Sequence, residues 1–199
     1  MLSGLTANTF ERLQLNAGVF LKGVSYSALT TLDAVEAAII TAMETEAGYL
    51  GATVGGGSFE CVPTMRQIEV DGMRSPVKGS QVIDSWSVKL KGTMKEVSPT
   101  RFSQAIPASE VSGTGAKITV KIKQNLSDAD YVDSLCWVGD TSKGLVLINL
   151  ANALNVSGAT FAFTDKGEGS IPFEFQAHLA SVGTDEYLPV EIVFFNEAA

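Results

Sequence analysis

A glycine-rich stretch, GATVGGGS at residues 51–58, is the part of the sequence that comes closest to a known chemical motif. A phosphate-binding P-loop reads G-x-x-x-x-G-K-[ST], and Gly51, Gly56 and Ser58 fall in register with it. Gly57, however, occupies the position of the lysine that contacts the phosphates. The order of the flanking patterns is also reversed, because a P-loop follows a strand and opens a helix. We therefore expect no nucleotide site, and we expect residues 55–57 to allow positive φ or close backbone approach where the chain enters a sheet.

His178 is the only histidine, so a catalytic triad or a histidine-based metal site must be built around it. It lies on a strand pattern near Phe175 and Leu179, and spacing identifies no serine or aspartate partner. We interpret it as a surface or interface residue. The aspartates within 128–133 suggest a calcium loop, but the central glycine and the twelfth-position glutamate are missing. An acidic turn before a strand is the preferred interpretation, and we expect no enzyme activity, cofactor or metal ion.

Two cysteines and two tryptophans are the remaining residues with distinctive chemistry. Cys61 and Cys136 are far apart and belong to no C-x-x-C motif. A single disulfide is one possibility, and two buried or partly buried thiols in a reducing cytosol is the preferred one. Both Trp86 and Trp137 have an aromatic ring of the kind that stacks on a sugar or a base. Trp86 shares its strand face with the apolar positions 88 and 90, which favours the core, whereas the role of Trp137 stays open.

Composition indicates one folded, acidic domain. The chain has 199 residues, 45% hydrophobic and 18% charged, and no low-complexity linker divides it, so we predict a single domain over 1–199. The net charge of −8 argues against a general nucleic-acid-binding surface, yet an acidic surface lets DNA pass without sticking. No signal-peptide pattern or apolar run of about 20 residues is present, so we expect synthesis in the cytosol and no membrane partner.

Two helices are predicted. In the segment 30–48, apolar residues recur at helical spacing, Thr30 and Asp33 resemble a capping box, and Gly48 is a plausible stop. A short second helix is expected to begin with Ser98 as N-cap and Pro99 at the first helical position, and to end before Pro107.

Most of the remaining chain alternates with the period of β-strands. In the clearest strand, Trp86, Val88 and Leu90 share one face and polar residues share the other. Segment 144–150 is apolar on both faces, as in a central strand. This pattern predicts a mainly β fold, an antiparallel β-sandwich or barrel of two packed sheets with one flanking α-helix. The expected strands are 13–24, 59–62, 66–70, 85–94, 117–123, 144–150, 159–163, 170–179 and 190–195.

Residues 48–106 resemble the tail tube proteins of long-tailed bacteriophages and Gram-positive prophages. The resemblance rests on the G-A-T-x-G-G-x-x-F entry into the sheet, on RQIEVDG and on LKGTMKEVSPTRFSQAI. The LQLNAGVFLKG segment and the ending KGEGSIPFEFQAHLASVGTDEYLPVEIVFF extend it over most of the chain. It implies two packed sheets with a flanking helix, related to type VI secretion tube proteins, and hexameric rings that stack into a tube for DNA. In that light, the glycines would serve a tight helix-to-strand junction: Gly51, Gly55, Gly56 and Gly57.

The resemblance also implies surfaces and partners. The partners are other copies of the chain, with tape-measure, tail terminator and baseplate or initiator proteins, while DNA passes without specific binding. The location is the virion tail, after assembly in the host cytoplasm. The candidate contact regions are the N-terminal arm (1–12), the C-terminal segment and an extended loop (71–82) that contains Asp71, Gly72, Met73, Arg74, Ser75, Pro76, Val77 and Lys78. The candidate polar sheet face, lining the channel or facing outward, comprises Ser85, Ser87, Lys89, Lys91, Lys117, Thr119, Lys121 and Lys123.

The lysines of this polar face conflict with a slippery channel, because a lysine-lined channel would grip phosphate. Either these faces look outward, or carboxylates from neighbours offset their charge. Three alternatives to the tail tube are kept. One is the inner tube of a contractile tail, a phage-tail-like bacteriocin or a secretion system. The second is a monomeric β-sandwich that binds carbohydrate or cell wall through Trp137 or other exposed aromatic residues. The third is an enzyme built around His178.

Overall fold

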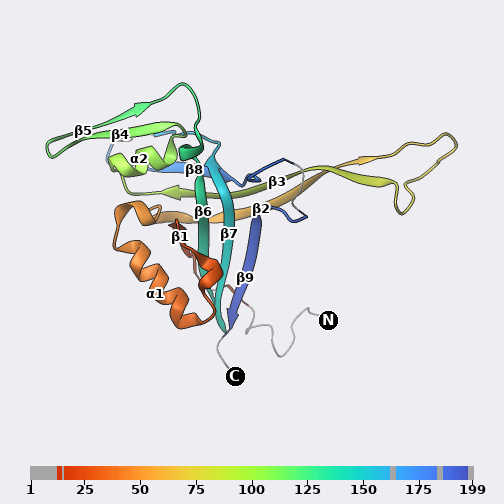
Figure 1. Ribbon diagram of the computed structural model, residues 1–199, viewed down its shortest axis with the longest axis horizontal. Coiled ribbons are helices and arrows are strands. Elements are labelled where there is room, and N and C mark those ends of the chain that lie inside the picture. The colour runs from red at the N-terminus through yellow and green to blue at the C-terminus, as the bar shows by residue number, and fades with distance from the viewer. Residues whose placement is uncertain (1–12, 15, 162–164, 183–185, 197–199) are drawn as a thin grey trace.

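The computed structural model describes residues 13, 14, 16–161, 165–182 and 186–196. These residues form nine β-strands and two α-helices, with short 3-10 turns between some of them (Figure 1). The N-terminal arm 1–12 lies outside the described residues. The elements are β1 (Val19–Lys22), α1 (Leu32–Met43), β2 (Thr53–Gln67), β3 (Gln81–Met94), α2 (Pro99–Ala105), β4 (Ser109–Thr114), β5 (Lys117–Ile122), β6 (Val132–Thr141), β7 (Gly144–Asn155), β8 (Ile171–Gln176) and β9 (Val190–Asn196).

Strand β7 connects two antiparallel sheets. Its residues 144–150 pair with β6 on one side and with β9 on the other, and β1 pairs with β6 at the edge. Its last two residues, Leu154 and Asn155, pair instead with β8, which continues the second sheet through β3 to β2. The fold is therefore mainly β, an antiparallel sandwich with flanking helices, as the sequence predicts. The prediction of 144–150 as a buried central strand is also confirmed, since residues 145–150 are all buried.

Two apolar clusters hold these layers together. The first lies between the sheets, where Phe20 of β1 meets Phe173 of β8 edge-to-face, with ring centroids 5.0 Å apart. The second lies under α1, whose Val35 packs against Leu21 and Cys136. Since burying a large apolar side chain contributes about 1.5–3 kcal/mol, these clusters are the main stabilising contribution to the body.

Helix boundaries differ slightly from the prediction. The N-cap of α1 is Thr31 rather than Thr30, because its hydroxyl accepts a hydrogen bond from the Ala34 amide at 3.3 Å. The helix ends at Met43, and Gly48 belongs to a separate 3-10 turn, Glu46–Gly48. Helix α2 matches its prediction, with Ser98 as N-cap and proline at the first position.

Several predicted strands have different bounds. Segments 59–62 and 66–70 belong to a single 15-residue strand, β2, which ends at Gln67. Of the described residues in the segment 13–24, only Val19–Lys22 form a strand. The predicted strand 159–163 is wrong for 159–161, which have no regular structure, and 162–164 lie outside the described residues. The alternation of apolar and polar residues does not show which segments have a neighbouring strand to pair with, and pairing sets the bounds of a strand.

The outer parts of β2 and β3, residues 61–67 and 81–87, project from the body as a two-stranded ribbon, which we call the β2–β3 ribbon (Figure 1). A loop over 68–80 closes it; compared with the predicted loop 71–82, it begins three residues earlier and ends two residues earlier. Within the described residues, no helix is long and apolar enough to span a membrane.

Candidate functional site

The glycines of residues 51–57 form a strand bulge rather than a simple junction. Thr53 pairs with Met94 but Gly57 pairs with Gly92, so two more residues lie on β2 than on β3 between these pairs. Gly55 and Gly56 take up this excess with φ values of +75° and +73°, which favour glycine. The prediction of a helix-to-strand junction is therefore wrong for 55–57, which lie inside the strand, and holds only for Gly51, just before it.

Gly57 serves close packing rather than positive φ. A Cβ atom at this position would lie 2.5 Å from the backbone oxygen of Lys91 and 2.9 Å from the ring of Phe20. The bulge therefore brings β2 against the sandwich core at a distance that only glycine permits. Gly55–Gly57 lie inside β2, whereas the glycines of a P-loop precede a helix whose N-terminus faces the phosphate.

The polar face of the β2–β3–β8 sheet balances its charges within one chain. Strand register places Glu60 opposite Lys89, and Glu174 opposite Lys91. The Lys89 ammonium lies 2.5 Å from the Glu174 carboxylate, and Lys91 lies 2.8 Å from Glu60 and 3.3 Å from Glu174. Carboxylates of neighbouring strands in the same chain thus offset the charge of these two lysines.

The titration of these groups reflects the same pairing. The hydrogen bond from Lys89 is the main cause that lowers the pKa of Glu174, with Lys91 adding to it. The hydrogen bond to Glu60 is the main cause that raises the pKa of Lys91. Both shifts favour the charged forms near neutral pH, so these two lysines are balanced by two carboxylates. We call this side of the sheet the charge-balanced face; its members are Ser58, Glu60, Val62, Thr64, Arg66, Ser85, Ser87, Lys89, Lys91, Glu174 and Gln176, and Arg66 is paired with Asp84.

The second half of the predicted polar face lies elsewhere. Lys117, Thr119 and Lys121 are on β5, which pairs only with β4 in a separate two-stranded hairpin. Lys123 lies just beyond β5 and contacts both carboxylate oxygens of Asp130 at 2.6 and 2.7 Å. The structure therefore does not bring the eight predicted residues onto one surface.

An apolar face runs outward from the core along the β2–β3 ribbon. Val88 and Leu90 are buried in the body, and the same face of β3 continues outward to Trp86 and Ile83. Trp86 is 39% exposed, so the prediction that it belongs to the core is wrong. Met65 lies opposite Ile83, with exposed fractions of 55% and 47%. We call this the apolar ribbon face, formed by Cys61, Pro63, Met65, Ile83 and Trp86.

At the base of the ribbon lies an open groove of about 540 Å³. It is lined mainly by aromatic and aliphatic side chains, among them Phe59, Trp137 and Phe194. Trp137, whose role the sequence left open, donates its indole N–H to the Ala17 carbonyl at 3.0 Å and lies partly buried beside the core. Phe194, on the edge strand β9, is 64% exposed. The predicted contact loop, Asp71–Lys78, lies at the far end of the ribbon and is almost wholly exposed.

The residues with catalytic chemistry have structural contacts instead. The Nδ1 atom of His178 lies 3.2 Å from the Asn152 carbonyl, and its ring meets Tyr131 edge-to-face. Asp128 and Asp130 form a 3-10 turn before β6, as expected for an acidic turn. Among the described residues, no group of three or more histidine, cysteine or acidic side chains is arranged to hold a metal ion.

Both cysteines are free, which agrees with the preferred interpretation. Burial raises the pKa of Cys136 to about 11, so this thiol stays protonated near neutral pH. Cys61, however, is exposed rather than buried.

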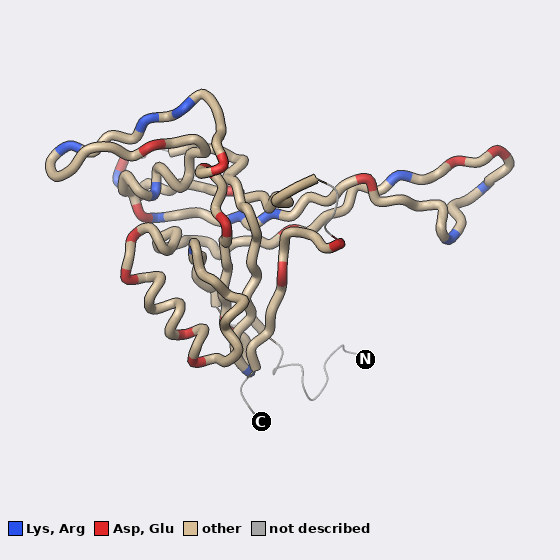
Figure 2. The backbone as a smooth tube through the Cα atoms, viewed as in Figure 1, with Lys and Arg blue, Asp and Glu red and all other residues tan. Residues whose placement is uncertain are grey.

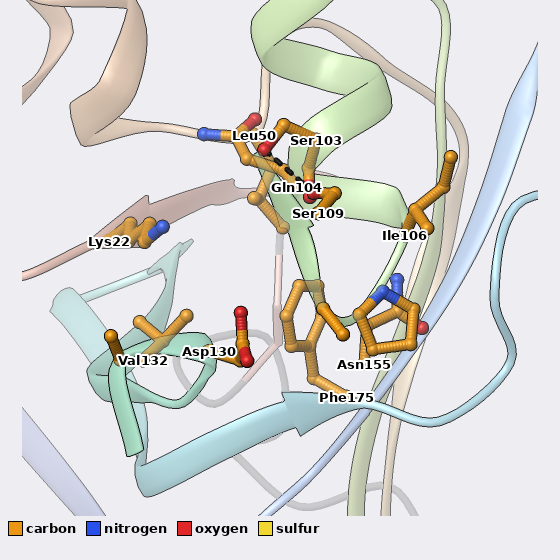
Figure 3. Close-up of a pocket in the computed structure, with 13 residues that line it drawn as sticks. Lys22, Leu50, Ser103, Gln104, Ile106, Ser109, Asp130, Val132, Asn155 and Phe175 are labelled. Atoms are coloured by element: carbon orange, nitrogen blue, oxygen red, sulfur yellow. Dashed lines mark hydrogen bonds between the residues drawn. The ribbon is translucent and has the colours of Figure 1, made fainter. Parts of the chain in front are cut away.

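A small polar pocket lies between α2, β1 and the 3-10 turn Asp128–Asp130 (Figure 3). Lys22 and Asp130 face it from opposite elements, and Ser103 and Ser109 hydrogen bond at its rim at 2.9 Å. Burial lowers the pKa of Lys22. The volume of about 90 Å³ has room for a few water molecules, whereas sites for organic ligands usually measure about 300–1,000 Å³. The pocket is therefore too small for a sugar or a nucleotide.

No protein-family model matches the chain, and a search of curated proteins finds no similar sequence.

Sequence reasoning missed the acidic half of the charge-balanced face and the apolar ribbon face. Glu60 and Glu174 belong to different strands from the lysines that they neutralise, and register is invisible in one sequence. Met65 and Ile83 lie outside the strands predicted from the sequence, and the structure places them in β2 and β3. The outer pairs are uncovered because β2 and β3 are 15 and 14 residues long, whereas β8 pairs only with Lys89–Met94 of β3. The sequence offered no signal for this difference in length.

Proposed function

We propose that this protein is a tail tube subunit, a structural virion protein that assembles with copies of itself into stacked, hexameric rings through which DNA passes. The sequence resemblance suggests this function, and one observation carries it. The apolar ribbon face continues the sandwich core beyond the body, where no described part of the same chain covers it.

Such a ribbon is unusual in an isolated domain. A two-stranded hairpin in water is marginally stable, and exposed apolar surface beside open strand edges favours pairing with another chain. Strands β1, β2 and β9 are edges of the two sheets that β7 connects. A closed ring of subunits would cover the apolar ribbon face and pair these edges, which is the physical advantage of a cyclic assembly.

The charge-balanced face is our candidate for the channel lining. Its lysines would retard DNA if they were free, but each is neutralised by a carboxylate of its own chain. Arg66 is likewise paired with Asp84, and the remaining members are uncharged. With an overall charge of −8, the subunit would let DNA slide without binding it.

The first experiment is to concentrate the purified protein and examine it by negative-stain electron microscopy together with light scattering. We expect rings or tubes with a central channel, formed either by the protein alone or after addition of an initiator complex. Particles that stay monomeric in both conditions would contradict the proposal. Co-assembly with a contractile sheath protein would assign the tube to a contractile tail or a related secretion system.

The neutralised lysines give a second prediction. Replacing Glu60 and Glu174 together by lysine removes the carboxylate partners of Lys89 and Lys91 and puts four cations beside one another on the charge-balanced face. We expect DNA to bind to assembled tubes of this variant with a steep dependence on salt. The wild type and Glu168→Lys, an exposed residue paired with Lys95, serve as references and should bind DNA much more weakly. Binding of the double variant no stronger than that of Glu168→Lys would remove this face from the channel lining.

The groove at the base of the ribbon favours a second function, carbohydrate or cell-wall binding by a monomer. Its volume of about 540 Å³ is large enough for an organic ligand, and Trp137 and Phe194 supply aromatic surface. Polar side chains that orient a sugar are few there, mainly Gln14, Asn16 and Ser58. Titration of a monomeric sample with cell-wall oligosaccharides, followed by tryptophan fluorescence, distinguishes the two functions.

A further inference from the structure

The outward face of helix α1 is acidic and partly apolar. Glu36 and Glu44 are exposed, and between them Ile40 and Met43 are 64% and 49% exposed. No ion pair within the described part of the chain involves either glutamate. Glu44 is also at the helix C-terminus, where the macrodipole favours a cation, and the last turn contains no basic residue. Within the described part of one chain, no ion pair therefore compensates the negative charges of Glu36 and Glu44.

A basic surface lies on the β4–β5 hairpin. Register places Lys117 and Lys121 on one face, while Ser109 on the other face hydrogen bonds to Ser103 of α2. The lysine face therefore points away from α2. Both lysines are exposed, and neither makes an ion pair within the described residues, although Lys121 lies across from Glu110.

The spacing of these charges matches. Glu36 and Glu44 are eight residues apart on a helix, about 12 Å at 1.5 Å per residue. Lys117 and Lys121 are four residues apart on a strand, about 13 Å at 3.3 Å per residue. The aliphatic stems of lysines laid across the helix would also cover Ile40.

We propose that the outward face of α1 in one copy binds the lysine face of the β4–β5 hairpin in a second copy. This inference rests on the proposed self-assembly and names two of its surfaces. Helix and hairpin lie at opposite ends of the same side of the molecule, and the ribbon projects from the other side (Figure 1). Figure 2 shows the acidic positions along α1 and the basic positions on the hairpin.

The two surfaces differ, so the contact is heterologous. Each added copy leaves one helix and one hairpin free, and the arrangement propagates head to tail. It therefore fits the stacking of successive rings rather than a closed dimer. Electrostatic contacts of this kind specify register and partner more than they add affinity.

Charge reversal tests the contact. In the first variant, Lys117→Glu and Lys121→Glu make both surfaces acidic; in the second, Glu36→Lys and Glu44→Lys make both basic. Each variant alone places like charges together, and we expect its association at about 0.05 M salt to fall about tenfold or more. An equimolar mixture pairs opposite charges at every contact, so association should return, as it should in the chain with all four substitutions, whose net charge equals that of the wild type.

Sedimentation velocity on the separate and mixed variants gives the answer, with circular dichroism to verify folding. Complexes that form only on mixing, whether dimers or tubes, support the contact. Variants that associate separately as the wild type does, or that fail to associate on mixing, overturn it. This readout is independent of the tube proposal, because wild-type tubes seen by microscopy alongside unaffected variants would reject the contact and keep the tube.

Discussion

Arg101→Ala is expected to lower the free energy of unfolding by about 3 kcal/mol. The Arg101 side chain is fully buried, and its guanidinium donates hydrogen bonds to both backbone and side-chain oxygens. Its Nη1 atom donates to the carbonyls of Glu46 at 2.7 Å and Tyr49 at 2.5 Å. Its Nη2 atom pairs with the Glu96 carboxylate at 3.1 Å, and its guanidinium carbon lies 4.3 Å from the centre of the Tyr49 ring.

The loss of stability depends on which hydrogen-bond acceptors are left without a partner when the guanidinium is removed. The Glu96 carboxylate is 40% exposed and can be hydrated, so its loss of a partner costs little. The space of the guanidinium stays inside the protein, and the partly buried Glu46 carbonyl loses the bond from Arg101, where an unpaired buried acceptor costs about 1–3 kcal/mol. The Tyr49 carbonyl keeps a 3.2 Å bond from the Gln104 amide. The affected segment links α1 to β2, so the entry of the chain into the ribbon strand should loosen first.

Urea unfolding followed by tryptophan fluorescence measures this effect. The matched control is Arg66→Ala on the β2–β3 ribbon, where the pair with Asp84 is 2.7 Å long but the side chains are 60% and 41% exposed. Exposed ion pairs contribute about 0–1 kcal/mol, so the control should change stability by less than 1 kcal/mol. Equal effects of the two substitutions would show that burial of Arg101 does not govern its contribution.

Much of the fold could be predicted from the sequence because local signals and packing agree there. Helix α2 has a serine cap and a proline at its first position, and strand β8 alternates Phe173 and Phe175 against Glu174 without interruption. The apolar run of β7 likewise required burial on both faces. At these places, propensity, periodicity and tertiary contacts lead to one answer.

The candidate site was harder to predict because it depends on pairing between distant segments. The observed N-cap of α1 is Thr31, one residue after the predicted Thr30. Both residues have a hydroxyl group that can cap a helix, so the sequence alone does not show which of them does. Alternation on β5 suggested a half-buried strand, but its neighbour is only β4, so Ile118 and Ile122 are exposed. Whether a strand face is covered depends on sheet order, which a single sequence does not encode locally.

The second large effect concerns assembly rather than stability. Replacing Met65 and Ile83 together by aspartate should abolish ring or tube formation while leaving the unfolding midpoint almost unchanged. Both side chains are about half exposed and opposite each other on the apolar ribbon face, so neither supports the core of its own subunit. In an assembly that covers this face, two carboxylates would be buried without partners, at a cost of several kcal/mol for each interface.

The control lies on the same ribbon. Thr64 and Ser85 are paired next to these residues but point to the opposite, charge-balanced face, so Thr64→Asp with Ser85→Asp adds the same charge at the same place in the chain. Under the proposal, this control still assembles, because its carboxylates face the water-filled channel. Light scattering and negative-stain microscopy compare the two double variants at equal concentration, and thermal unfolding verifies that both are folded.

If both assemble, the apolar ribbon face is not an interface, and if both fail, added charge on the ribbon rather than loss of apolar burial prevents assembly. Failure of the Met65 and Ile83 variant alone would identify the apolar ribbon face as the surface that joins one subunit to the next.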